Sequence, residues 1–366
     1  MRGLSSKEER PLFLFLREKN AFASRCFDGY LRPMTKSQSS SAIIILIQFI
    51  FAGCAQNLQM SSPIVTYQGT STQLTFQNKA FTLKGSPTDA AFKAEGTAYV
   101  TDSGLIRFDV TSASGAGAPA AGTVTYGIGI PGVFFVVRPF DGGTQQMWPM
   151  LSAGCPQVDA ALNWVEMDVT HGIGVEMFGT YQFDLLTSQA SFPRRFDLNR
   201  NDSGSAALGS ISCSGGVATL PSASVITSRF GGSLVAPTPA TGSLRLSIPQ
   251  ETVPLSALNG TYSGIIYSTS LINAAVTFSN GTMTYRSIKP ETVQPDGVVP
   301  VTTINGFAAN SPSDGFFSGS FSTDPNRKVT CAVTLDAIHD GRSILLCVGG
   351  DTSSSDQYFA AVLTSL

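Results

Sequence analysis

The stretch AAVTFSNGTMTYRSI, residues 274–288, predicts a β-hairpin. Asn280-Gly281 stands between two runs of alternating character, Ala274–Ser279 and Thr282–Ile288. The two-residue turn that joins antiparallel strands most tightly needs a positive φ at both central positions, and Asn-Gly tolerates it. This part of the chain is therefore expected to be antiparallel β-structure.

Similar short runs fill the rest of the C-terminal region, residues 259–366. One opens the region at Asn259–Tyr267, before the hairpin. Those after the hairpin are Val298–Asn305, Gly315–Ser322, Lys328–Leu335, Ser343–Val348 and Tyr358–Leu363. About eight strands at this spacing fit an up-and-down barrel or a sandwich, and the sequence leaves both open.

The region 63–248 has the same character. Its candidate strands are Gln73–Phe76, Ala80–Lys84, Phe92–Thr101, Leu105–Thr111, Thr123–Ile130, Val133–Arg138, Ala161–Val169, Val175–Leu185, Ser203–Ser214, Val217–Leu220 and Ser243–Ile248. No long window has a helical period with caps. We predict an all-β protein with two antiparallel β domains, 63–248 and 259–366, joined by a Pro-containing linker at 249–258.

The N-terminal segment has the pattern of a signal peptide. The apolar run Ala42–Ala52 is shorter than the roughly 20 residues that a spanning helix needs, and it follows Met34-Thr35-Lys36 and a Ser-rich stretch. A basic start, a short apolar run and small residues before a cleavage point are typical of exported proteins. We therefore predict a signal peptide at 34–53.

The end of that run, Phe51-Ala52-Gly53-Cys54, resembles the lipobox of bacterial lipoproteins. The resemblance implies that Cys54 becomes the lipidated N-terminus and that 54–62 forms a tether. By the same analogy, Ala55 implies sorting to an outer membrane, on its periplasmic face or at the cell surface. The expected partner is thus the membrane itself, through acyl chains. Residues 1–33 are interpreted as a gene-start artefact or an extension.

Composition excludes one class of partner. The net formal charge is −2, only 13% of residues are charged, and no Lys/Arg cluster follows Cys54. Nucleic-acid binding needs clustered positive charge, because the phosphates must be neutralised. We therefore expect no nucleic-acid partner.

Four cysteines follow Cys54: Cys155, Cys213, Cys331 and Cys347. An even number in an exported chain indicates disulfides, although four cysteines allow three pairings. The turn-like His339–Gly341 lies between the last two, which would place them opposite each other in a hairpin. Cys155 would then pair with Cys213.

A second, shorter resemblance lies at the start of the C-terminal region. Gly260-Thr261-Tyr262-Ser263-Gly264 is similar to first strands of lipocalin-like and avidin-like barrels. The resemblance implies a barrel that carries a small apolar ligand. Phe178-Gly179-Thr180-Tyr181 echoes the motif and suggests a duplicated module.

Other candidate sites give weaker signals. Gly127–Gly132 matches GxGxxG, but a strand-like run follows it where a dinucleotide site needs a helix, so no cofactor is predicted. Asp197, Asn199 and Asn201 have the spacing of a calcium loop, without its glycine and its bidentate Glu. We predict no metal site beyond this weak candidate.

Three functions remain open from the sequence. The first is a non-enzymatic envelope lipoprotein with a structural, adhesive or protein-interaction role. The second is a carrier of a small apolar ligand, with Trp148, Trp164 and Tyr181 as further candidate pocket residues. The third is a hydrolase with an unfamiliar site, for which the polar candidates are Glu166, Asp168, His171 and His339.

Overall fold

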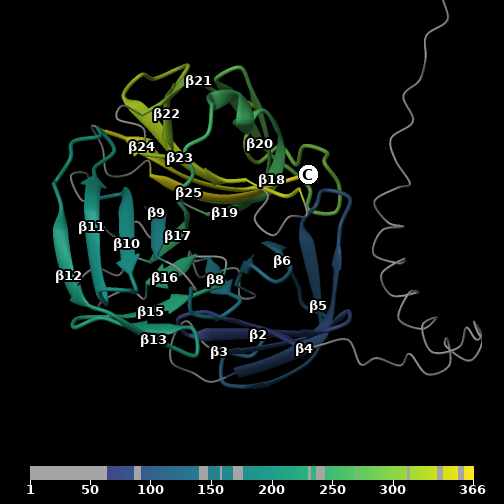
Figure 1. The fold of residues 1–366 in the computed structure, drawn as a ribbon. Coiled ribbons are helices and arrows are strands. Elements are labelled where there is room, and N and C mark those ends of the chain that lie inside the picture. The colour runs from purple at the N-terminus through teal and green to yellow at the C-terminus, as the bar shows by residue number, and fades with distance from the viewer. Residues whose placement is uncertain are drawn as a thin grey trace, which may run out of the picture. The chain divides into compact units, whose positions relative to one another are not determined.

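A computed structural model shows an all-β protein (Figure 1). It describes residues 64–85, 92–139, 147–156, 159–167, 176–229, 232–235, 244–268, 270–310, 314–335, 341–352 and 358–366. The only helix in these ranges is a single 3₁₀ turn, η1 (Leu255–Leu258). In the described part of the chain, no helix has the length and apolar character needed to cross a membrane. The all-β prediction is confirmed.

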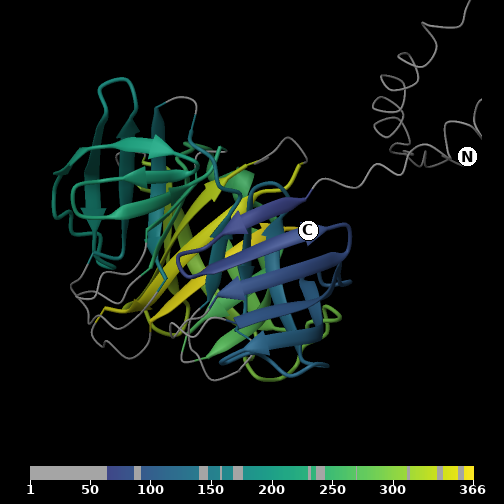
Figure 2. The same ribbon diagram turned by 90° about the horizontal axis from the view of Figure 1, so that it is seen from below.

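The first eight strands form a closed antiparallel barrel, here called the first barrel. Its strands are β1 (Val65–Gln68), β2 (Thr72–Gln77), β3 (Ala80–Gly85), β4 (Phe92–Val100), β5 (Ile106–Gly115), β6 (Val124–Ile130), β7 (Phe134–Val137) and β8 (Trp148–Leu151). β1 pairs with β8 where Gln68 faces Leu151, which closes the ring. Figure 2 shows its purple and blue strands wound side by side.

A nine-stranded antiparallel sheet follows, here called the middle sheet. Its strands are β9 (Ala160–Glu166), β10 (Phe178–Asp184), β11 (Gln189–Phe196), β12 (Ala206–Ser210), β13 (Ser212–Ser214), β14 (Val217–Thr219), β15 (Ser224–Thr227), β16 (Ser233–Val235) and β17 (Arg245–Pro249). β9 pairs with both β10 and β17, and only Ile211 separates the two edge strands, β12 and β13. The region 63–248, expected as one domain, thus holds two sheet systems, because β8 already completes the first ring.

The last eight strands form a closed barrel, here called the second barrel, so the barrel alternative holds over the sandwich. Its strands are β18 (Gly260–Tyr267), β19 (Leu271–Ser279), β20 (Thr282–Ser287), β21 (Thr302–Ala309), β22 (Phe316–Phe321), β23 (Arg327–Thr334), β24 (Ile344–Asp351) and β25 (Phe359–Ser365). The Asn-Gly hairpin is confirmed: Phe278 faces Met283, and Asn280 has a φ of 49°.

The two barrels share a local pattern. In the β2–β3 hairpin Phe76 faces Phe81 and Asn78 has a φ of 58°, as in the β19–β20 hairpin. The preceding strands also correspond, since Thr66 faces Thr75 just as Thr261 faces Thr277. The counterpart of Thr261-Tyr262 is therefore Thr66-Tyr67, whereas Thr180-Tyr181 lies in β10, the second strand of the middle sheet.

Apolar side chains fill each sheet system and also the space among the three. The barrel interiors and the middle sheet have separate clusters. A fourth cluster, here called the shared core, joins outward-facing residues of all three systems, such as Phe134, Phe178 and Leu346. This explains β24, where Ile344, Leu346 and Val348 belong to the shared core and Leu345 and Cys347 to the barrel interior. A strand covered on both faces reads as a continuous apolar run.

A polar contact also ties the first barrel to the second. Glu291, in the connection between β20 and β21, lies 2.5 Å from the Arg107 guanidinium and accepts a hydrogen bond of 2.7 Å from the Tyr126 hydroxyl. Desolvation raises the pKa of Glu291, but the bonds from Tyr126 and Arg107 outweigh it and the pKa is lowered. Burial, aided by the Glu291 charge, raises the pKa of Tyr126 to about 12.

Candidate ligand-binding pocket

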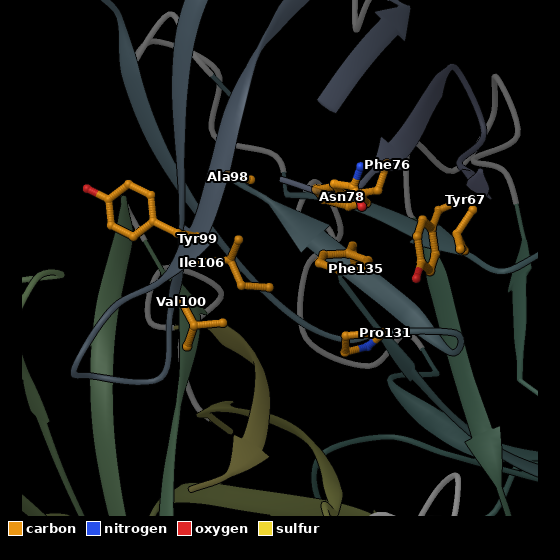
Figure 3. A pocket seen from close by; sticks show the side chains of 10 residues that line it. Tyr67, Phe76, Asn78, Ala98, Tyr99, Val100, Ile106, Pro131 and Phe135 are labelled. Carbon is orange, nitrogen blue, oxygen red and sulfur yellow. The ribbon is translucent and has the colours of Figure 1, made fainter. Parts of the chain in front are cut away.

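A pocket of about 340 Å³ opens at one end of the first barrel (Figure 3). Its lining residues come from β1, β2, β4, β5 and β7 and from two turns: Val65, Tyr67, Phe76, Asn78, Ala98, Tyr99, Val100, Ile106, Pro131 and Phe135. Nine of these ten residues are apolar or aromatic, and none is acidic or basic. Small-molecule sites are typically concave, apolar and about 300–1,000 Å³ in volume, so the pocket falls at the small end of that class.

Three aromatic rings form one wall. Tyr67 meets Phe135 edge-on with ring centroids 4.5 Å apart, and Phe76 lies 4.9 Å from Phe135. Aromatic pairs favour such arrangements of their rings and add stability to that gained from burying apolar area. Figure 3 shows Tyr67, Phe76 and Phe135 across the pocket from Ala98 and Ile106, with the Tyr99 ring pointing away from them. The three rings therefore hold one another in place.

The side of the pocket opposite the aromatic wall has room because the short side chain of Ala98 lies there. Ala98 faces Phe108 across the β4–β5 pair, and its backbone N–H donates to the carbonyl of Lys79. That bond holds the β2–β3 turn against β4 at the pocket edge. A larger residue at Ala98 would occupy the space in front of Ile106.

Polar groups at the pocket are few. The Tyr67 hydroxyl accepts a hydrogen bond of 2.7 Å from the Gly132 backbone N–H. Burial raises the pKa of Tyr67, and this bond opposes the rise. The phenol therefore stays protonated at neutral pH and keeps its own proton for one further acceptor. Asn78 supplies an amide at the mouth.

Both predicted disulfides are confirmed. Cys155 is bonded to Cys213, 58 residues away, and Cys331 to Cys347, 16 residues away. Cys331 and Cys347 face each other across the β23–β24 hairpin and are fully buried inside the second barrel. The spacing argument worked here because paired cysteines in a hairpin share one register position.

The weak calcium candidate has its oxygens engaged by protein donors. Both the backbone N–H and the side-chain amide of Asn201 donate to the Asp197 carboxylate, at 2.9 and 2.7 Å. The Lys328 ammonium lies 3.5 Å from the Asn199 side-chain oxygen. Within the described ranges, His, Cys, Asp and Glu do not gather in threes that could hold a metal ion.

The other polar and aromatic candidates lie in separate places. Trp148 belongs to the interior of the first barrel, whereas Trp164 and Tyr181 belong to the middle sheet. Asp168, His171 and His339, like Cys54, fall outside the described residues. The structure therefore does not unite the three aromatic residues in one pocket.

Glu166 lies on β9 beside Arg245. It is 1% exposed, and its carboxylate lies 3.8 Å from the Arg245 guanidinium, which stacks on Trp164 at 4.5 Å. Burial raises the pKa of nearby Tyr181 to about 12, against the opposing effect of the Arg245 charge. The Glu166 carboxylate is therefore enclosed by protein and faces a guanidinium rather than solvent.

No known family model matches the sequence, and no curated protein is similar to it. The pocket residues escaped the sequence reasoning because Tyr67 and Phe135 are far apart along the chain. The sequence did contain one signal: the run Val133–Val137 is too apolar for a strand with one face exposed to solvent. It indicated burial on both faces, without saying that one face borders a cavity.

Proposed function

We propose that the protein is an exported envelope lipoprotein, held at a membrane by acyl chains on Cys54, with a non-enzymatic structural, adhesive or protein-interaction role. The observation that carries the proposal is the pair of disulfides in the described body. Disulfides persist in oxidising compartments such as the periplasm or the cell exterior and are rare in the cytosol. This agrees with the signal-peptide and lipobox patterns that precede the body.

The anchor would be strong. Each buried CH₂ contributes about 0.8 kcal/mol, and stable attachment needs more than one chain or a second signal. A lipoprotein with several acyl chains satisfies that requirement without any transmembrane helix. The body, Ser62–Leu366, is one compact unit.

Replacing Cys54 by serine is expected to abolish acyl labelling and to lower the fraction of the protein that is retained in membranes. The measurement is incorporation of labelled palmitate in expressing cells, followed by fractionation with detergent. Cys26→Ser is the matched control, because Cys26 lies upstream of the expected cleavage point. Full acyl labelling of the Cys54 variant would contradict the proposed anchor. Loss of acyl labelling in the Cys26 variant would contradict it as well.

A second candidate function is the binding of a small apolar ligand, and the pocket of the first barrel favours it. The sequence placed this role in the second barrel. There Phe278, Phe317, Phe359 and the Cys331–Cys347 disulfide belong to one interior cluster. The first barrel instead combines an apolar cavity with a wall of contacting aromatic rings.

The uncharged dye N-phenyl-1-naphthylamine, which fluoresces in apolar sites, tests this candidate. We expect it to bind the purified body, residues 55–366, and Ala98→Leu to weaken binding about tenfold, a loss of ~1.4 kcal/mol. Ala113→Leu is the control, because Ala113 packs against the same interior without lining the pocket. Equal affinities for both variants would place the dye elsewhere.

The hydrolase alternative has one described residue, Glu166, and its carboxylate faces Arg245 at 3.8 Å. Catalytic carboxylates work in a cleft that substrate can enter. With 1% of its surface exposed, Glu166 has no such access. No observation among the described residues favours this function over the other two.

A further inference from the structure

We infer that the pocket of the first barrel takes the hydrocarbon chain of a single-chain anionic amphiphile, of which a long-chain fatty acid is the simplest. The inference rests on the proposed carrier role and adds the class of ligand. Three observations support it: the chemistry of the walls, the open mouth with its apolar rim, and a cation at the edge of that mouth.

The walls offer dispersion contacts and almost no hydrogen bonds. Phe76, Phe135 and Ile106 present only carbon to the cavity, and the Tyr67 hydroxyl, which accepts from Gly132, has a single donor left. A ligand with many polar groups would lose its hydration there without compensation, which is unfavourable. A hydrocarbon chain has no such polar groups, and its burial is favourable for each CH₂ removed from water.

The volume limits the number of chains. An engineered cavity of ~150 Å³ holds one benzene, and this pocket measures about 340 Å³. That space suits part of one acyl chain, with the remainder extending out of the mouth. Two-chain lipids would leave their second chain exposed to water, so we favour a single-chain ligand.

The rim continues the apolar surface outward. Val100 lines the pocket and is 68% exposed, although a valine gains nothing from contact with water. Single exposed apolar residues are common and need no explanation. Val100 differs because it borders an apolar cavity, so a chain leaving the pocket would cover it.

A basic residue, Lys79, directly follows the pocket-lining residue Asn78. Lys79 is exposed at the β2–β3 turn, next to Asn78, and its carbonyl accepts the N–H of Ala98. The turn is therefore fixed at the pocket edge. Asn78 can donate a hydrogen bond and Lys79 can pair with a carboxylate, which together suit an anionic head above an apolar tail.

The supply of such ligands follows from the proposed anchor. The residues between Cys54 and Ile64 number nine, 55–63, and an extended chain of that length spans at most ~35 Å. The start of β1 would thus stay within that distance of the lipid surface. Val65, the first residue of β1, lines the pocket.

Displacement of the bound dye from the purified body, residues 55–366, tests the inference. We expect stearate and methyl stearate to displace the dye and Ala98→Leu to weaken both about tenfold. We expect Lys79→Gln to weaken stearate about fivefold and to leave methyl stearate unchanged. Lys84→Gln is the matched control, because Lys84 is also exposed but lies near the end of β3 that is farther from the Asn78-Lys79 turn.

The outcomes separate the two proposals. Displacement by naphthalene but not by stearate would overturn the acyl-chain inference and leave the carrier role intact. Displacement by phosphatidylglycerol vesicles but not by stearate would replace the single-chain ligand with a two-chain lipid. Absence of dye binding would remove the carrier role itself. Because the body lacks Cys54, none of these results depends on the anchor, which the palmitate label tests separately.

Discussion

Replacing Cys155 and Cys213 together by alanine is expected to lower the free energy of unfolding by about 4 kcal/mol. The disulfide closes a loop of 58 residues, and long loops lose the most entropy when the unfolded chain is cross-linked. Both cysteines are only partly buried, so the lost side-chain volume adds little. Urea unfolding followed by circular dichroism measures the change.

The single variants provide the control for this prediction. Removing either cysteine breaks the same cross-link, so Cys155→Ala and Cys213→Ala should each cost as much as the double change. Additive losses from the two single variants would show that the effect comes from packing at each site. A loss below ~1 kcal/mol would show that the unfolded chain is already restrained in this region.

Replacing Phe178 by alanine is expected to cost about 3–5 kcal/mol. Phe178 is fully buried in the shared core, where its ring lies 5.1 Å from that of Phe196 and 5.0 Å from that of Phe316. It therefore contacts its own sheet and the second barrel at once. The change removes both contacts and leaves a cavity that neither strand layer can close alone.

Leu186→Ala is the control for the Phe178 variant. Leu186 is 89% exposed, and substitutions at such positions usually change stability by less than ~0.5 kcal/mol. The same urea titration serves both variants. If the Phe178 variant lost no more stability than the Leu186 variant, Phe178 would not join the middle sheet to the second barrel in solution.

Local patterns predicted local structure well. The Asn280-Gly281 turn set the register of its hairpin, because a two-residue turn leaves the flanking strands one way to pair. Cys331 and Cys347 followed from the same logic, since residues equally far from a turn face each other. Both inferences needed only neighbouring residues and one geometric rule.

Proline misled the strand assignment in both directions. Strands β8 and β11 were missed, because they contain Pro149 and Pro193, which cannot donate to the ladder. The strand expected at Val298–Asn305 begins only at Thr302 and runs to Ala309. Pro300 precedes it, and the residues before that belong to the connection that carries Glu291 to the first barrel.

Long-range features lay beyond such reasoning. The division of 63–248 into two sheet systems depends on Gln68 meeting Leu151, and no local pattern reports which strand closes a ring. The pocket depends in addition on what is missing, namely a large side chain at Ala98. A sequence shows which residues are apolar, but an unfilled space appears only when all the neighbours are in place.

The shared core has a consequence for biogenesis. Phe134 and Val136 of the first barrel belong to the same cluster as Leu346 and Val362, which are synthesised last. A chain that is exported from its N-terminus would display the outer apolar face of β7 until the final strands arrive. Partly folded states with such surfaces aggregate. We therefore expect the yield of this protein to depend on a holding chaperone in the compartment that receives it.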